Sequence, residues 1–231
     1  MPVLVSIAIA LVLIVAGVLV VRSTAAALKR AEYIRTYAFP KGLFEKLVQR
    51  RPEMEPRHAA LVLRGLRQFF LGYLKAKGKY VSMPSQVADD LWHEFILHTR
   101  EYSAFCQKAF GGYMHHTPAS VLGPDKQTNE GLRRTWWWAC RDENINPAKP
   151  SRLPLLFALD SKLNISNGFV YAPDCNALRR NGSGGGYCAG DFASSDIDGG
   201  TSGFGDSGFG GPDGGGSDGG CGGGGCGGGG D

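Results

Sequence analysis

The sequence predicts an all-α protein that consists of an N-terminal single transmembrane helix, a small helical domain and a disordered glycine-rich C-terminal tail. Three observations predict this class: an uncharged apolar run near the N-terminus, apolar residues at helical spacing through the middle, and a glycine-rich end. The predicted boundaries are residues 1–30 for the transmembrane anchor and juxtamembrane helix, 31–165 for the helical domain, 166–181 for a turn-rich linker and 182–231 for the tail.

The predicted anchor is the stretch from Pro2 to Val21, which carries no charge and a single hydroxyl, at Ser6. As a helix that rises about 1.5 Å per residue, it spans about 30 Å, the thickness of the hydrocarbon core of a bilayer. Residues 23–27 would allow cleavage of a secretory signal, but no basic residue precedes the apolar run. The sequence therefore favours a retained membrane span over a signal peptide.

Positive charge near the span lies on its C-terminal side, at Arg22, Lys29, Arg30, Arg35, Lys41, Lys46, Arg50 and Arg51. By the positive-inside rule, this predicts a single-pass membrane protein with its domain and tail on the cytoplasmic side. The lipid bilayer is thus the first expected partner. The same basic residues are also of the kind that anionic headgroups attract.

The middle of the chain is predicted to form helices, since no strand alternation of any length competes. Between Pro56 and Lys77 the apolar side chains recur at the spacing of an amphipathic helix, and Gly78 supplies a stop. Further helices are expected over 42–50, 84–97, 100–110, 125–139 and 154–163. Two of these, 84–97 and 100–110, are equally compatible with one long helix.

Four of the five histidines lie between Asp89 and His116. Asp89 and His93 are four residues apart, so they project from one face of a helix. Together with Cys106 and His116 they form a candidate metal site of a type acceptable to zinc or iron. A cysteine with a histidine and an aspartate is also a set used in nucleophilic catalysis, and a buried Asp–His pair beside an apolar cysteine is the purely structural alternative.

A family resemblance rests on the order of Asp89, Trp92, His93, Tyr102, Cys106, Gly111 and His116, followed by Thr135 and Trp136. Over residues 58–145 this order resembles the glycine-rich domain-containing protein family, the plant glycine-rich domain proteins and their bacterial relatives. The resemblance implies a helical domain of unsettled biochemical activity, whose plant members are associated with stress and developmental responses. The plant pattern has a second histidine where this chain has Phe95, which weakens a His-x-His metal pair here.

Three consecutive tryptophans, residues 136–138, cover about 200° of a helix, so at least one indole is predicted to face away from the domain core. Such an indole would suit a protein partner or the membrane interface, where tryptophan is enriched. A partly buried surface helix that binds nothing is the alternative.

The tail from residue 182 onward holds 25 of the 35 glycines and seven aspartates but no lysine or arginine. Its charge is therefore −7, and subtraction from the net +4 leaves +11 on the first 181 residues. This composition predicts disorder, because it buries too little apolar surface to offset the entropy of ordering. The acidic tail is a candidate site for a protein partner, whereas a nucleic-acid partner is not expected without interleaved arginines.

Two functions follow from these observations. The first is a membrane-anchored, non-enzymatic interaction protein, which the sequence favours because it has no phosphate loop, nucleophile elbow, HExxH or Rossmann fingerprint. The alternative is a metal-binding or catalytic helical domain that uses Asp89, His93, Cys106 and His116.

Overall fold

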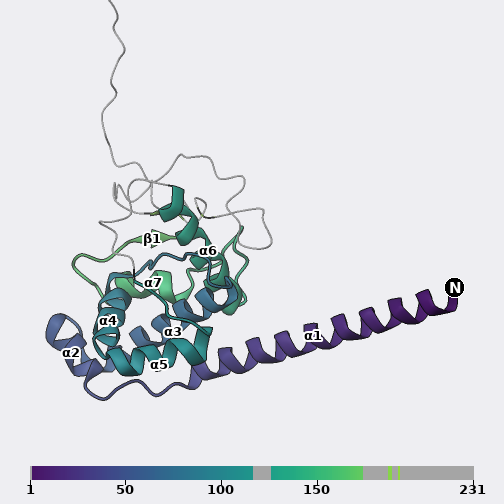
Figure 1. The fold of residues 1–231 in the computed structure, drawn as a ribbon. Helices are drawn as coiled ribbons and strands as arrows, with labels where there is room; N and C mark the ends of the chain where they lie inside the picture. Colours follow the sequence, from purple (N-terminus) through teal and green to yellow (C-terminus); the bar gives the residue numbers. More distant parts are fainter. Residues whose placement is uncertain (1, 117–125, 174–186, 189–191, 193–231) are drawn as a thin grey trace, which may run out of the picture.

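The computed structural model describes residues 2–116, 126–173, 187–188 and 192, and most of these residues are helical (Figure 1). The elements are α1 (Pro2–Thr36), α2 (Leu43–Arg50), η1 (Pro56–His58), α3 (Ala59–Lys75), α4 (Gln86–Leu97), α5 (Thr99–Phe110), α6 (Lys126–Asp142), α7 (Leu155–Lys162), β1 (Tyr171–Ala172) and β2 (Tyr187–Cys188). The prediction of a mostly helical protein is confirmed.

Helix α1 projects away from the rest of the protein, and only its last turns join the domain (Figure 1). Its described side chains are exposed as far as Lys29, whereas Ala31 and Ile34 are buried in the core. The helix is long and apolar enough to cross a membrane, with a mean hydropathy of 2.8 over its most apolar window. Because α1 is one continuous helix, its apolar part and the domain share a single rigid element.

Helix α3 is the centre of the domain and contacts α1, α4, α6 and α7. Its core face follows the helical spacing of the sequence, since Val62, Leu66, Phe69 and Phe70 are all buried. Gly65 lets α7 approach closely, because a Cβ atom there would lie 2.4 Å from a methyl carbon of Leu159.

Helices α4 and α5 are two elements, which settles the alternative that the sequence left open. The chain leaves helical geometry at His98, where φ is −79° and ψ is 63°. Ser85 caps the N-terminus of α4, and its hydroxyl accepts a hydrogen bond from the Ala88 N–H at 3.3 Å. Gly111 ends α5 with a φ of +82°, a left-handed conformation that glycine adopts without strain.

The folded part of the chain extends into the segments predicted as linker and disordered tail. β1 pairs in parallel with β2, in the register Tyr171 to Tyr187. Phe192 is 2 % exposed, and its ring lies 5.6 Å from that of Trp136 and 5.9 Å from that of Phe157. Burial of this aromatic ring offsets the ordering entropy that argued for disorder at this point. The remainder of the predicted tail lies outside the described residues.

The tryptophans of α6 agree with the prediction that at least one indole faces away from the core, because Trp137 lies outside the hydrophobic core that Trp136 joins and Trp138 packs against. Trp136 and Trp137 are buried, and Trp138 is half-buried beneath Lys75, whose ammonium lies 5.8 Å from the indole ring. The guanidinium of Arg141 covers the ring of Trp137 at 4.8 Å. These two basic side chains therefore cover part of the indole surface that was expected for a partner or a membrane interface.

Candidate metal centre

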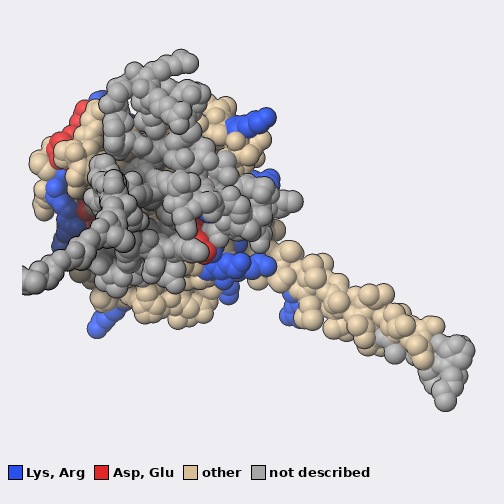
Figure 2. All heavy atoms as spheres, turned by 90° about the horizontal axis from the view of Figure 1, so that it is seen from above, with Lys and Arg blue, Asp and Glu red and all other residues tan. Residues whose placement is uncertain are grey.

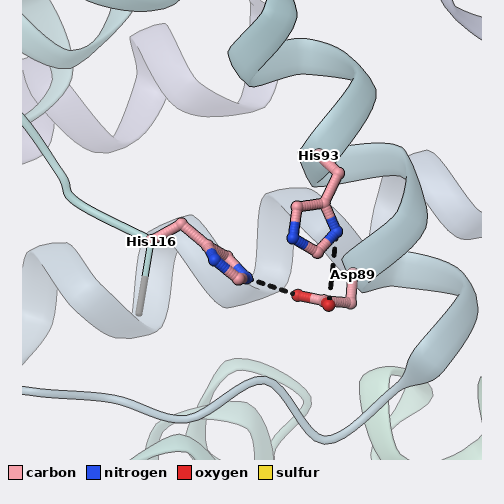
Figure 3. A group of neighbouring side chains, drawn as sticks. All are labelled: Asp89, His93 and His116. Carbon is pink, nitrogen blue, oxygen red and sulfur yellow. Dashed lines mark hydrogen bonds and ion pairs between the residues drawn. The ribbon is translucent and has the colours of Figure 1, made fainter. Parts of the chain in front are cut away.

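Asp89, His93 and His116 converge at the surface of α4 (Figure 3). One helical turn separates Asp89 from His93, so both side chains leave the same face of α4. His116 arrives from the segment that follows α5. Asp89 Oδ2 lies 3.4 Å from His93 Nδ1, and Asp89 Oδ1 lies 3.1 Å from His116 Nε2.

The group is half-buried and opens toward solvent on the side of His93. The exposed fraction of the side chain is 14 % for His116, 22 % for Asp89 and 41 % for His93. The two imidazole rings lie beside each other, with centroids 4.2 Å apart, and the carboxylate lies against both (Figure 3). A ligand from solvent can therefore reach the group without a rearrangement of the core.

The spacing of these side chains fits a small transition-metal ion. One ligand atom from each of the three residues lies within 4.8 Å of the other two. Around a tetrahedral ion with bonds of about 2.1 Å, ligand atoms are about 3.4 Å apart, so small side-chain movements would close the site. Two imidazoles with one carboxylate suit zinc, and the same set with open positions suits ferrous iron.

A hydrogen-bonded chain from the core fixes the position of His116. Tyr102 is buried, and its hydroxyl donates to the Met114 carbonyl at 2.6 Å and accepts from Trp92 Nε1 at 3.1 Å. The ring of Trp92 in turn contacts His116 edge-on, with centroids 4.7 Å apart. Trp92 and Tyr102 therefore hold the segment that carries His116 against α4.

Cys106 belongs to this supporting layer, although the sequence placed it among the candidate ligands. Among the described residues, the candidate ligands that lie close enough to share a metal ion are Asp89, His93 and His116, and Cys106 is not one of them. The cysteine is fully buried and is hydrogen-bonded to Tyr102 and to the backbone of Met114. Burial raises the pKa of its thiol, and these hydrogen bonds only partly oppose the rise. A neutral, buried thiol is a poor nucleophile and a poor ligand.

Phe95 explains how this chain departs from the plant pattern. Its side chain is fully buried and packs against Tyr102, with ring centroids 5.1 Å apart. The position two residues after His93 thus faces the aromatic core, and a histidine there would not share the face of Asp89 and His93. The neighbouring His115 is exposed and contacts Tyr113 instead, with ring centroids 4.7 Å apart.

Sequence reasoning missed the acceptor that anchors this network, the backbone carbonyl of Met114. The Met114 carbonyl is a backbone group, so no residue type marks it in advance. The nearest signal is the spacing of Tyr102 and Cys106, which are four residues apart on the core face of α5.

Comparison with known proteins identifies the family. The sequence model of a family described as UCP032817-like matches residues 29–192. The chain belongs to the UCP032817-like family. A search of curated proteins and a search of solved structures found no match.

The limits of the match to the UCP032817-like family agree with the structure. The match begins at Lys29, just before α1 enters the domain, and ends at Phe192, which packs into the core. The family description names no activity, so function has to be argued from the site. The resemblance to glycine-rich domain proteins is not tested by this match and stays a prediction.

Proposed function

We propose that this chain is a single-pass membrane protein whose helical domain binds one zinc or ferrous ion through Asp89, His93 and His116. The observation that carries the proposal is the convergence of two imidazoles and one carboxylate within 4.8 Å of one another. The purely structural alternative is a carboxylate that only orients two histidines. Both arrangements account for the two short contacts, and the metal content of the protein distinguishes them.

Three protein ligands leave a coordination position for water or a small ligand. Catalytic zinc sites use this arrangement, whereas structural zinc sites close all four positions with side chains. The exposure of His93 supports an open position, since solvent reaches the group from that side. The supporting contacts from Trp92 and Tyr102 would hold His116 in place while the fourth ligand exchanges.

The membrane part of the proposal rests on α1. Its apolar stretch matches the thickness of a bilayer, and basic residues follow on its C-terminal side. This asymmetry supports an orientation with the domain and tail in the cytoplasm. Cysteines in the cytoplasm are normally reduced, which is compatible with the free thiols of Cys106 and Cys140.

The sequence also favours a non-enzymatic interaction protein. This proposal is compatible with the metal site, because a protein can bind a metal ion without catalysing a reaction. Its first expected docking element is the α6 tryptophans, where Arg141 covers the ring of Trp137. The other is the acidic tail, which lies largely outside the described residues.

The direct test is the metal content of the full-length chain, purified in detergent micelles and analysed by mass spectrometry for zinc and iron. We expect about one ion per chain after exposure to either metal and removal of excess. His93→Ala, His116→Ala and Asp89→Asn should each abolish this stoichiometry, because each removes one of three ligands.

His115→Ala is the matched control, since it removes an exposed histidine next to the site without touching the three ligands. It should retain the metal. A wild-type chain that binds no metal, but melts at a lower temperature once His93 is replaced, would identify the group as structural and overturn the proposal.

A further inference from the structure

The ends of α3 and α5 lie at the side of the domain from which α1 projects (Figure 1). Arg30 of α1 donates a hydrogen bond to the carbonyl of Phe110, the last residue of α5, at 3.2 Å. The ring of Phe110 also contacts Tyr73 in the last turn of α3, with centroids 4.9 Å apart. These contacts place the C-terminal ends of both helices beside the root of α1.

This side of the domain is basic. Lys77 and Lys79 follow the end of α3, and Lys108 lies in the last turn of α5 with its ammonium 5.9 Å from the ring of Tyr33. All three lysines are exposed, and within the described residues none has a carboxylate within 4.0 Å. Figure 2 shows basic side chains at the root of α1.

Two of the basic residues that follow the span, Arg50 and Arg51, are already paired with carboxylates elsewhere. Arg50 pairs with Glu94 at 2.8 Å, and Arg51 donates to Asp90 at 2.6 Å. Both pairs join the C-terminal end of α2, or the residue that follows it, to α4, and α2 lies away from the root of α1 (Figure 1). The fold therefore determines which basic side chains remain unpaired and can interact with a membrane, and position in the sequence alone does not.

Helix geometry brings the basic side close to the headgroups. If the hydrocarbon boundary lies near Arg22, Arg30 lies about 12 Å below it along the axis of α1. The headgroup layer itself is about 5–8 Å thick, so the gap is within the reach of a lysine side chain and within a Debye length. Because α1 continues unbroken into the core, the domain cannot rotate its basic side away from the membrane surface.

We propose that Lys77, Lys79 and Lys108, together with Lys29 and Arg22, form a face that binds the headgroups of anionic phospholipids. We call it the headgroup face. The inference rests on the proposed membrane span, but it is independent of the metal site. Binding would hold the domain at a fixed height and orientation on the bilayer.

The test uses the full-length chain in nanodiscs of phosphatidylcholine alone, and in nanodiscs that also contain phosphatidylglycerol. Lysines are acetylated by a water-soluble reagent, and the rate at each lysine is read by mass spectrometry. We expect Lys77, Lys79 and Lys108 to react about fivefold more slowly in the anionic discs, as about 1 kcal/mol per residue implies. Lys46 on α2 is the internal control, because α2 lies at the opposite end of the domain, and its rate should not change (Figure 1).

A triple variant, Lys77→Gln, Lys79→Gln and Lys108→Gln, should remove any rise in melting temperature that the anionic discs give. The matched variant Lys41→Gln, Lys46→Gln and Lys162→Gln removes the same charge from other exposed sites and should keep that rise. Equal acetylation rates in the two kinds of disc would overturn the headgroup face. A chain that fails to insert into nanodiscs at all would instead contradict the proposed span.

Discussion

Tyr102 is the residue that joins the hydrophobic core to the candidate metal centre. Its ring packs against Phe95, and its hydroxyl anchors the Met114 carbonyl two residues before His116. Burial raises the pKa of this phenol, so it stays a neutral donor at neutral pH and well above it. The precise placement of His116 therefore depends on a group that binds no metal.

Replacing Tyr102 with Phe should weaken metal binding without removing a ligand. Loss of the hydroxyl leaves the buried Met114 carbonyl without its donor, so we expect a loss of about 1–3 kcal/mol in the free energy of unfolding. Metal affinity should fall about 10-fold or more, as for other supporting residues of metal ligands. Denaturant titration and metal titration measure the two effects.

Tyr113→Phe is the control for this substitution, because Tyr113 is exposed and neighbours the same segment. It should change neither quantity. If Tyr102→Phe loses stability but binds metal with unchanged affinity, the role of Tyr102 in positioning His116 is refuted.

Glu143 gives a prediction about pH. Burial alone would raise its pKa, but hydrogen bonds from the Leu155 N–H and the Gln68 amide, with the hydrogen bond and charge of Arg152, lower it below its ordinary value of 4.5. Because the pKa of Glu143 is lower in the folded state, its ionised carboxylate stabilises the protein above pH 4.5. This stabilisation is lost as the pH falls through the folded-state pKa. Glu143→Gln should therefore cost about 1–2 kcal/mol at neutral pH, and less at acidic pH.

Denaturant titrations of the wild type and the Glu143→Gln variant over a range of pH from neutral to well below 4.5 check this. The two curves should converge at the acidic end. A difference that stays constant over the whole range would show that the carboxylate charge contributes nothing.

At the residue scale, the sequence could predict the local half of the site. Asp89 and His93 are four residues apart, so helix geometry alone places them on one face. His116 is 27 residues from Asp89, and its approach depends on the turn at Gly111 and on the tertiary contact with Trp92. Cys106 lies in the core and outside the group of three, a placement that spacing cannot predict because it does not tell a side chain that faces the core from one that faces a site.

At the scale of elements, α4 is the platform of the site, and α7 holds its N-terminus. The buried carboxylate of Asp160 accepts hydrogen bonds from the Ser85 hydroxyl at 2.7 Å and from the Gln86 N–H at 2.7 Å. It also accepts from the backbone N–H groups of Val87 and Phe169. A negative charge at this helix end is favourable, because the free N–H groups there carry partial positive charge.

Asp160→Asn should destabilise the protein by about 2–4 kcal/mol, since an amide presents a donor where several donors already converge. Thermal or denaturant unfolding measures the loss, and Ser161→Ala is a neighbouring control that should have little effect because Ser161 is exposed. A loss below about 0.5 kcal/mol would show that Asp160 does not support α4.

Most helices could be predicted from the sequence because their apolar spacing and glycine stops are local signals. The break between α4 and α5 could not be resolved, since the residues around His98 fit a continuous helix as well as two. The pairing of β1 with β2 could not be predicted either, because strands of two residues carry no alternation and pair across a long connection.

At the scale of the whole molecule, the folded unit reaches further than composition indicated. Phe192 lies within a glycine-rich and acidic segment, yet it packs against Trp136, Phe157 and Tyr171. Composition is averaged over many residues. It therefore cannot reveal a single aromatic side chain that packs against residues distant in the sequence. The family match ends at the same residue.

Phe192→Ala should cost about 3 kcal/mol in the free energy of unfolding, through lost burial and the cavity that remains. Phe204→Ala is the matched control, because the sequence places Phe204 in the predicted disordered tail, and it should have no measurable effect. Equal stability of the two variants would show that the C-terminal segment contributes nothing to the core.

Asp89, His93 and His116 are the proposed ligands of the metal ion, and Cys106 is not. X-ray absorption spectroscopy at the zinc edge, on the zinc-loaded full-length chain, identifies the ligand atoms. We predict a first shell of nitrogen and oxygen at about 2.0–2.1 Å, with the outer-shell scattering of two imidazoles. A sulfur atom at about 2.3 Å, or no bound zinc to measure, would contradict the account.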